Sequence, residues 1–344
     1  MTRHDPARFA ASPRSLGYRM PAEYAPHKRT WMMWPTRAEV WPDMSATKRD
    51  YVKVARAIAE FEPLCMAVCP EDAAEARAML GNGIELFEVP LDDSWARDAG
   101  PNFVVDGKGG KAASLFTFSA WGHKYAPFDK DAAFGAAVAA RERMPVFKSP
   151  LLAEGGGVTV DGEGTIITTD TCFLNPNRNP SWTREEVTRE LLETLGGEKV
   201  IWLPGNADET ETDGHVDGIA VFVAPGVVLI EGADDPADPW RHIKQANIDA
   251  LRGQTDAKGR EIRMATIPEA EESCVIGDRF CRSYVNCYFV NGGVIMPEYG
   301  TPNDSVARQV FQDLFPTCRI RGVHIPNICL GGGGIHCITQ QEPA

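Results

Sequence analysis

One segment pattern recurs along the chain and limits what the chain can fold into. Each copy begins with a charged or glycine-rich stretch, continues as a short apolar strand, turns at a glycine and returns as a second apolar strand. Such alternation around an Asp-Gly or Asn-Gly pair predicts a β-hairpin. The four copies are DSWARDAGPNFVVDGKGGKAASLF, EGGGVTVDGEGTIITT, DGHVDGIAVFVAPGVVLIE and SYVNCYFVNGGVIMPEY.

Helices and further strands alternate between the hairpins, as in an α/β protein. Apolar stripes at helical spacing and glycine or proline stop signals define the helices, and short β-branched runs define the strands. We predict helices over residues 45–61, 70–80 and 303–315 and after a capping box at Thr183 and Glu186, and strands over residues 64–68, 84–89, 200–203 and 320–325.

The polar starts of the modules recur at a loose period. Asp98, Glu154, His215, Asn286 and Cys337 mark five of them, each 51 to 71 residues after the last. Five such ββαβ modules arranged radially form a five-bladed α/β propeller, whose polar strand starts converge on a central cavity. The fifth module is truncated, so we expect a strand around residues 30–34 to complete the ring. The alternative is a three-layer α/β sandwich with hairpins at its sheet edges.

No linker, low-complexity tract or charged run divides the 344 residues. We therefore expect a single domain spanning residues 1–344, with residues 1–18 as a flexible N-terminal arm. Residues 1–20 contain four arginines, a weak likeness to a transit peptide, but they lack the apolar core of a secretory signal. We favour the interpretation as a cytoplasmic protein.

Charge and cysteine content exclude several classes of protein. The chain has 35 basic and 48 acidic residues, a net charge of −13 that disfavours nucleic acid and anionic membrane surfaces. No apolar run is long enough to span a membrane. The odd number of nine cysteines, without an export signal, favours reduced thiols. Without a CxxC pair or clustered histidines, we expect no metal site.

Cys337 is a candidate nucleophile. It follows four consecutive glycines, Gly331 to Gly334, so that a ligand can approach its backbone closely. The alternative is a buried thiol beside a flexible turn. If residues 335–339 form a strand, the neighbouring His336 points to the opposite face and is not the base for Cys337.

His215 is a better candidate for the base. His215 and Asp217 stand two residues apart, which on a strand places the imidazole and the carboxylate on one face. The nearby acids Glu209, Glu211 and Asp213 raise the basicity of the imidazole. A solvated acidic loop is the alternative interpretation.

Asp98 and Glu154 occupy equivalent module starts. If the modules converge, these two residues and Asp217 form an acidic basket that faces Cys337 and His215. Guanidinium is the cation that fits such a basket best, because its planar donors pair bidentately with carboxylates. Attack of the thiolate on the held guanidinium, loss of ammonia and hydrolysis of the covalent thiouronium would give a urea-type product without a cofactor.

Several long motifs, all in the same order, carry a resemblance to a known family. The motifs are RTWMMWP, DDSWARDAGP, EGGGVTVDGEGTIITTDTCFLNPNRNP, ETDGHVDG, SYVNCYFVNGGVIMP and GGGGIHCITQQEP. With these motifs the chain resembles the agmatine deiminases, of the bacterial-type peptidylarginine deiminase group within the guanidine-modifying, five-bladed propeller (pentein) superfamily. The resemblance covers nearly the whole chain.

This resemblance implies a role for each matching residue. The roles are Cys337 as nucleophile, His215 as general acid and base, Glu154 as the acid that assists proton transfer and grips the guanidinium, Asp98 and Asp217 as guanidinium clamps, Trp95 as an aromatic wall over the substrate, and Glu211 as a contact for the far amine. The implied reaction converts agmatine and water into N-carbamoylputrescine and ammonia, a step from arginine toward polyamines. The expected partner is a small cationic guanidine.

Two departures from the family pattern leave the substrate open. Gly334 stands where many members have asparagine, and Thr210 stands where an acid is common. Arginine, peptidyl-arginine or another ω-guanidino amine are therefore alternatives, although no arginine in the matched motifs supplies a carboxylate clamp. An amidinotransferase and a non-catalytic polyamine or guanidine binder are further alternatives. The sequence also leaves the oligomeric state open, a homo-oligomer included.

Overall fold

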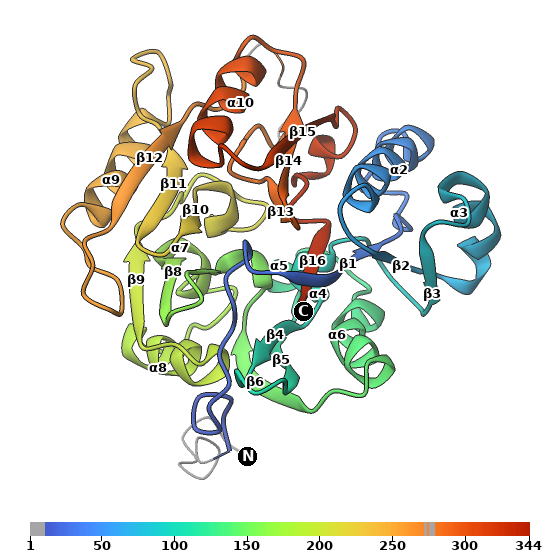
Figure 1. Cartoon of the computed structure of the whole chain (residues 1–344), viewed down its shortest axis with the longest axis horizontal. Helices are drawn as coiled ribbons and strands as arrows, with labels where there is room; N and C mark the ends of the chain where they lie inside the picture. Colours follow the sequence, from blue (N-terminus) through green and yellow to red (C-terminus); the bar gives the residue numbers. More distant parts are fainter. Residues whose placement is uncertain (1–10, 272–273, 275–278) are drawn as a thin grey trace.

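The strands of the computed structural model form five small sheets around a common centre, with the longer helices on the outside (Figure 1). The model describes residues 11–271, 274 and 279–344. Because the sheets are separate, the three-layer sandwich is wrong and the five-bladed α/β propeller is confirmed.

Four blades repeat one plan, an antiparallel hairpin followed by a helix and a third strand parallel to the second. Their strands are β4 (Asn102–Val105), β5 (Lys111–Thr117) and β6 (Val146–Leu152); β7 (Thr159–Val160), β8 (Thr165–Thr169) and β9 (Lys199–Leu203); β10 (Ala220–Ala224), β11 (Val227–Glu231) and β12 (Arg263–Ile267); and β13 (Tyr288–Val290), β14 (Gly293–Glu298) and β15 (Arg319–His324). The connecting helices are α6 (Asp129–Arg141), α8 (Arg184–Leu195), α9 (Arg241–Leu251) and α10 (Asn303–Leu314). The four hairpins expected from the repeated segments are thus confirmed.

The fifth blade joins the two ends of the described chain. Strand β16 (Thr339–Pro343) pairs antiparallel with β1 (His27–Met33), which pairs parallel with β2 (Leu64–Val68). Strand β3 (Glu85–Glu88) completes this sheet, and α2 (Met44–Ala59) and α3 (Ala73–Leu80) pack beside it. The expected ring closure by a strand near residues 30–34 is confirmed.

Apolar faces of the strands and helices meet between neighbouring elements and form the core. Helix α8 shows how local sequence sets this packing, since Leu191 and Leu195 are buried against the sheet that contains Ile166. Its start is fixed by the expected capping box, in which the Thr183 hydroxyl accepts from the Glu186 amide. Helices α6 and α9 were not expected, because they follow Phe128 and Trp240, whose side chains cap neither helix.

Part of the expected N-terminal arm is packed. The Ser12 hydroxyl donates to Glu193 on α8 over 2.6 Å, and the ring of Tyr18 lies 5.7 Å from that of Phe147. Residues 11–18 therefore lie on the folded body, which corrects the expectation for this half of the arm; residues 1–10 lie outside the described residues. In the described part of the chain, none of the helices combines the length and apolar composition of a membrane span.

Candidate active site

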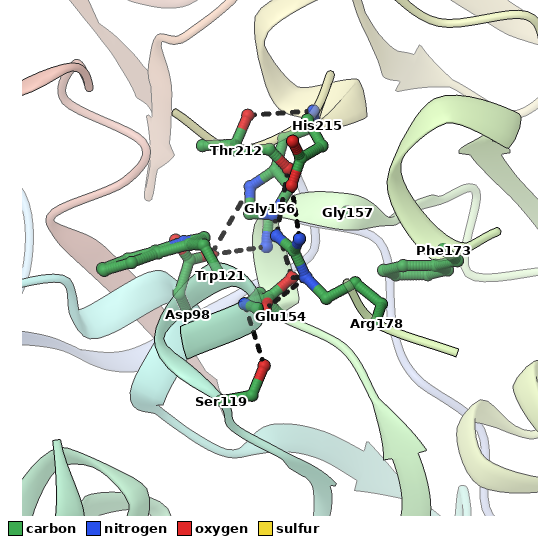
Figure 2. A network of polar contacts seen from close by, with 12 residues as sticks. Asp98, Ser119, Trp121, Glu154, Gly156, Gly157, Phe173, Arg178, Thr212 and His215 are labelled. Carbon is green, nitrogen blue, oxygen red and sulfur yellow. Dashed lines mark hydrogen bonds and ion pairs between the residues drawn. The ribbon is translucent and has the colours of Figure 1, made fainter. Parts of the chain in front are cut away.

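The polar starts of three blades meet around Gly156, in a short turn of helix over Gly155–Gly157. A Cβ atom added to Gly156 would lie 2.6 Å from His215 Nδ1 and 2.9 Å from both Asp217 Oδ2 and Asp98 Oδ1. Figure 2 shows Asp98 and His215 on the two sides of this glycine. The expected convergence of module starts therefore occurs, and the absent side chain leaves room for a planar group.

His215 is buried and sits between two carboxylates. Its Nε2 atom lies 3.2 Å from Glu154 Oε2, and its Nδ1 atom lies 3.8 Å from Asp98 Oδ1. Burial alone would lower the pKa of His215, but the negative charge of Asp98 and the hydrogen bond to Glu154 raise it well above its usual value. The imidazole is thus held in its protonated form, ready to act as an acid.

The backbone around His215 differs from the expectation. His215 precedes a single turn of 3₁₀-helix over Val216–Gly218 and is not part of a strand. The idea that His215 and Asp217 share a strand face is therefore wrong. Both side chains nevertheless approach Gly156, one from the start of this helical turn and one from within it.

Arg178 holds Glu154 and was missed by the sequence analysis. Its Nε atom lies 2.9 Å and 3.2 Å from the two oxygens of Glu154, and both side chains are fully buried (Figure 2). Burial alone would raise the pKa of Glu154, but the Arg178 charge and the hydrogen bond from His215 lower it. Arg178 stands inside the quoted NPNRNP motif, yet nothing in that motif indicates which acid it meets.

A possible metal ligand set lies beside this pair. Donor atoms of Glu154, Cys172 and His215 lie within 4.8 Å of one another, a combination that zinc can use. The sequence did not reveal it because three separate segments contribute. Arg178 already provides a positive charge at Glu154, so we assign no metal to this group.

Cys337 touches Asp217 and Asn286. The Cys337 sulfur lies 3.6 Å from Asp217 Oδ2 and 3.3 Å from Asn286 Nδ2. Burial, together with the charges of Asp217 and Asp98, raises the pKa of the Cys337 thiol well above its usual value. In the sequence, Asn286 marks a module start, and no local pattern indicates its contact with the sulfur.

The segment before β16 is a turn and not the strand considered for residues 335–339. The expected opposite orientation of His336 and Cys337 therefore loses its basis. The His336 ring bonds Asp217 Oδ2, the oxygen that also contacts the sulfur, over 2.7 Å, and it bonds Glu23 on its other side. Burial and Arg97 would lower the pKa of His336, but Glu23 and Asp217 raise it. His336 thus fixes the orientation of the Asp217 carboxylate.

Aromatic rings form one wall of the site. Trp95 stacks on Trp41 at 5.4 Å and meets Trp121 edge to face at 6.3 Å. Trp121 Nε1 donates to Asp98 Oδ2 over 2.9 Å, which orients that carboxylate (Figure 2). Trp95, Trp121, Asp98 and Cys337 line a narrow pocket of about 20 Å³. The sequence predicted Trp95 but missed Trp121, whose segment lies outside the matched motifs.

Glu211 lies where this narrow pocket meets a larger cavity of about 250 Å³ that also reaches Cys337. One Glu211 oxygen accepts from the Tyr125 hydroxyl over 2.6 Å, and Arg279 Nε lies 3.9 Å from the other. Arg279 and Arg282 line the larger cavity. Both arginines lie outside the matched motifs, so no sequence pattern indicates their position.

The two departures from the family pattern lie in different surroundings. A Cβ atom at Gly334 would lie 2.5 Å from Asn286 Oδ1, so the glycine makes room for the amide that contacts Cys337. Thr210 is exposed, and its carbonyl accepts from Lys124 over 2.6 Å. Of the two departures, only Gly334 therefore adjoins a residue that contacts the nucleophile.

Known proteins resemble the chain over nearly its full length. A relative from Streptomyces coelicolor, provisionally named an agmatine deiminase, is 43% identical over 341 residues, which cover 95% of this chain and 99% of the relative. A Legionella pneumophila relative with the same provisional name is 40% identical over 96% of this chain and 97% of its own. The solved agmatine deiminase of Enterococcus faecalis superposes with a TM-score of 0.93 at 35% identity, over 96% of this chain and 97% of that chain.

The match to a family model spans the same region. The model of the Porphyromonas-type peptidyl-arginine deiminases matches residues 19–343, which include all five blades and each residue of the site described above. The chain therefore belongs to the Porphyromonas-type peptidyl-arginine deiminase family.

Proposed function

We propose that this protein is an agmatine deiminase, which hydrolyses agmatine to N-carbamoylputrescine and ammonia through a covalent intermediate on Cys337. The observation that carries this proposal is the meeting of Asp98, His215 and Asp217 around Gly156, beside the Cys337 sulfur. The full-length similarity to the agmatine deiminase of Enterococcus faecalis supports it.

Asp98 and Asp217 bind the two sides of the guanidinium. Their carboxylates are buried, and each is oriented by a second group, Trp121 for Asp98 and His336 for Asp217. Charge-assisted hydrogen bonds from a planar guanidinium fit such a pair of acids. Trp95 closes the site as an aromatic wall, since a cation is attracted to a ring face.

Substrate binding activates the nucleophile. In the free protein, burial and the charges of Asp217 and Asp98 raise the pKa of Cys337 and keep it in its thiol form. A bound guanidinium neutralises these two acids and places a positive charge beside the sulfur, which favours the thiolate. The protein thus forms its reactive thiolate only with a cation in place.

The reaction then proceeds in two halves. The sulfur attacks the guanidinium carbon, a C–N bond breaks, and ammonia leaves with a proton from His215, so that a thiouronium remains on Cys337. Water gives one proton to the now neutral His215 and attacks the same carbon. The C–S bond then breaks, and the hydroxyl proton passes to the departing sulfur, a transfer that forms the ureido carbonyl and restores the thiol. The departing ammonia carries away the former thiol proton as ammonium, so guanidinium and water become a ureido group and ammonium.

Glu154 and Glu211 have supporting roles. Glu154, fixed by Arg178, stabilises the protonated His215 and grips the guanidinium. Glu211 receives the far ammonium of agmatine, since it lies at the junction of the two cavities that reach Cys337. We also propose that the protein works in the cytosol, where its nine free cysteines stay reduced.

The first test measures ammonia release from a panel of guanidines with Cys337→Ala and the control Cys318→Ala, which changes a cysteine away from the site. We expect release from agmatine by the wild type and the control, and none by Cys337→Ala with its circular dichroism unchanged. Release from arginine or peptidyl-arginine in preference to agmatine contradicts the substrate assignment. Transfer of the amidino group to added glycine or lysine would identify an amidinotransferase instead.

A second test uses the pH dependence of alkylation at Cys337. The raised thiol pKa predicts that neutral iodoacetamide reacts only as the pH rises toward that pKa. A cationic haloacetamidine is expected to react at neutral pH, because its charge replaces that of the substrate. Mass spectrometry of the modified Cys337 peptide provides the readout. A Cys337 thiol that stays unmodified at full ligand occupancy contradicts the proposal that the protein is an enzyme and favours a non-catalytic binder.

A further inference from the structure

The larger cavity extends from Cys337 to a cluster of charged residues that the proposed reaction does not use. This end of the cavity, the Glu231 chamber, is lined by Glu231, Lys244, Glu269, Arg282 and Ser283. A water molecule takes up about 30 Å³. The cavity of about 250 Å³ can therefore hold an ion of that size together with several water molecules.

The Glu231 chamber is joined by hydrogen bonds to the chain segment that follows Asp217, a residue that contacts the nucleophile. Glu231 ends β11, and its amide donates to the carbonyl of Ile219 over 3.0 Å. The Ser283 hydroxyl donates to the carbonyl of Gly218 over 2.8 Å. The two accepting carbonyls belong to the two residues that follow Asp217, whose carboxylate contacts the Cys337 sulfur.

The charges of this cluster do not balance. Lys244 pairs with Asp238 and Glu269, and Arg282 lies 3.0 Å from Glu269. With Glu231, three carboxylates of the described residues face two cations, so this set has one negative charge in excess when all are ionised. Burial and the charge of Glu269 raise the pKa of Glu231 well above its usual value. The carboxyl group therefore keeps its proton until another cation arrives.

One oxygen of Glu231 is available for that cation. Glu231 is only 6% exposed, and its Oε1 atom has no hydrogen-bond partner among the described residues. A buried carboxylate oxygen without a donor is costly, so an N–H donor with a positive charge is the ligand that satisfies it best. Glu211, by contrast, already contacts Tyr125 and Arg279.

We propose that the Glu231 chamber binds the ammonium ion that the reaction releases. This inference rests on the proposed function for the origin of the ion. Ammonia forms between His215 and Cys337, while the organic product, with its own ammonium tail, still occupies the Glu211 side. The chamber opens from the same point, so ammonium enters it ahead of the organic product and binds Glu231 Oε1.

The test compares the wild type with Glu231→Gln in two measurements. The first is the shift in melting temperature caused by ammonium chloride relative to equal sodium chloride, which requires no activity. The second is inhibition of deimination by ammonium, normalised to the uninhibited rate of each protein. We expect stabilisation of the wild type, and an ammonium affinity about tenfold weaker in Glu231→Gln, because one charge-assisted hydrogen bond is lost. Glu163→Gln, at a half-buried position that does not line the cavity, is the matched control.

Different cations separate the remaining interpretations. Equal effects of ammonium in the wild type and in Glu231→Gln overturn the proposal, as does an ammonium effect no larger than that of sodium. Potassium acting as well as ammonium would show a general monovalent-cation site, and tighter binding of methylammonium would identify an external amine; either result overturns the assignment to the product. If Glu231→Gln does not fold, Glu231→Asp, which withdraws the carboxylate, is expected to weaken ammonium binding. Should deimination be absent, the melting-temperature arm still tests the chamber.

Discussion

Gly156 and Gly334 are two of the positions where an added side chain would reach the catalytic groups or the residues that contact them. The first leaves space between His215 and the two guanidinium clamps, and the second leaves space for the Asn286 amide. A methyl group is therefore enough to change the site at either position. Substitution to alanine tests the proposed guanidinium position without removing any functional side chain.

Gly156→Ala is expected to lower kcat/KM for agmatine about a hundredfold, because the added methyl displaces the groups that position the substrate. Gly218→Ala is the matched control, since its Cβ would meet none of the described atoms within 4 Å. Steady-state kinetics and the melting temperature should be measured for both. A Gly156→Ala protein with normal kinetics would show that the guanidinium binds elsewhere.

Individual site residues were predictable where they occupy a module start or belong to a motif that the family shares. Cys337, His215, Asp98 and Glu154 stand at module starts, so the repeat itself indicated that they converge. Residues that orient them could not be identified this way. The Arg178 partner of Glu154 lies 24 positions away, and the Glu23 partner of His336 lies 313 positions away. Such partnerships depend on how the blades face one another, which local patterns do not encode.

At the scale of elements, the helix ends show which local signals determine structure. The Thr183 hydroxyl and the Glu186 carboxylate each bond the other residue's amide at the start of α8. Thr183→Ala is expected to destabilise the protein by about 1 kcal/mol, because a helix cap is lost. Thr183→Ser retains the hydroxyl and serves as the control. Urea unfolding measures both, and equal stability of the two variants would contradict the role of the cap.

The same scale shows where sequence patterns fail. Hairpins with glycine turns, strands with β-branched runs and capped helices were all predictable. Helix α6 was not, because alanines dominate it and Gly135 interrupts its apolar stripe. That glycine is required by packing, since a Cβ there would lie 2.9 Å from Leu115. The turns that hold His215 and Cys337 were also missed, because short strands and single helical turns share the same apolar pattern.

At the scale of the whole molecule, Glu342 connects β16 to β1, the two strands whose pairing closes the ring. It is buried on β16, accepts from Trp31 Nε1 and pairs with Lys28 and Lys111. We propose that residues 11–344 unfold as one cooperative domain, since no blade contains the whole site.

Glu342→Gln is expected to destabilise the entire protein by about 2 kcal/mol, because the buried Glu342 side chain loses its charge-assisted contacts with the partly exposed Lys28 and Lys111. Glu60→Gln, which breaks exposed ion pairs with Arg319 and Arg321, should cost less than about 1 kcal/mol. Tryptophan fluorescence and circular dichroism should report one coincident transition in urea. Two separate transitions would contradict the single domain.

The closure of the ring also governs how the protein folds. Trp31 and Glu342, bonded across β1 and β16, are 311 positions apart, and such distant pairings form slowly because a long loop must close first. Cys337 lies two residues before the start of β16, so the nucleophile reaches the acids of the other blades only when this pairing forms. Four blades can gain their secondary structure earlier. In a refolding experiment, the return of catalytic activity therefore reports the slowest step.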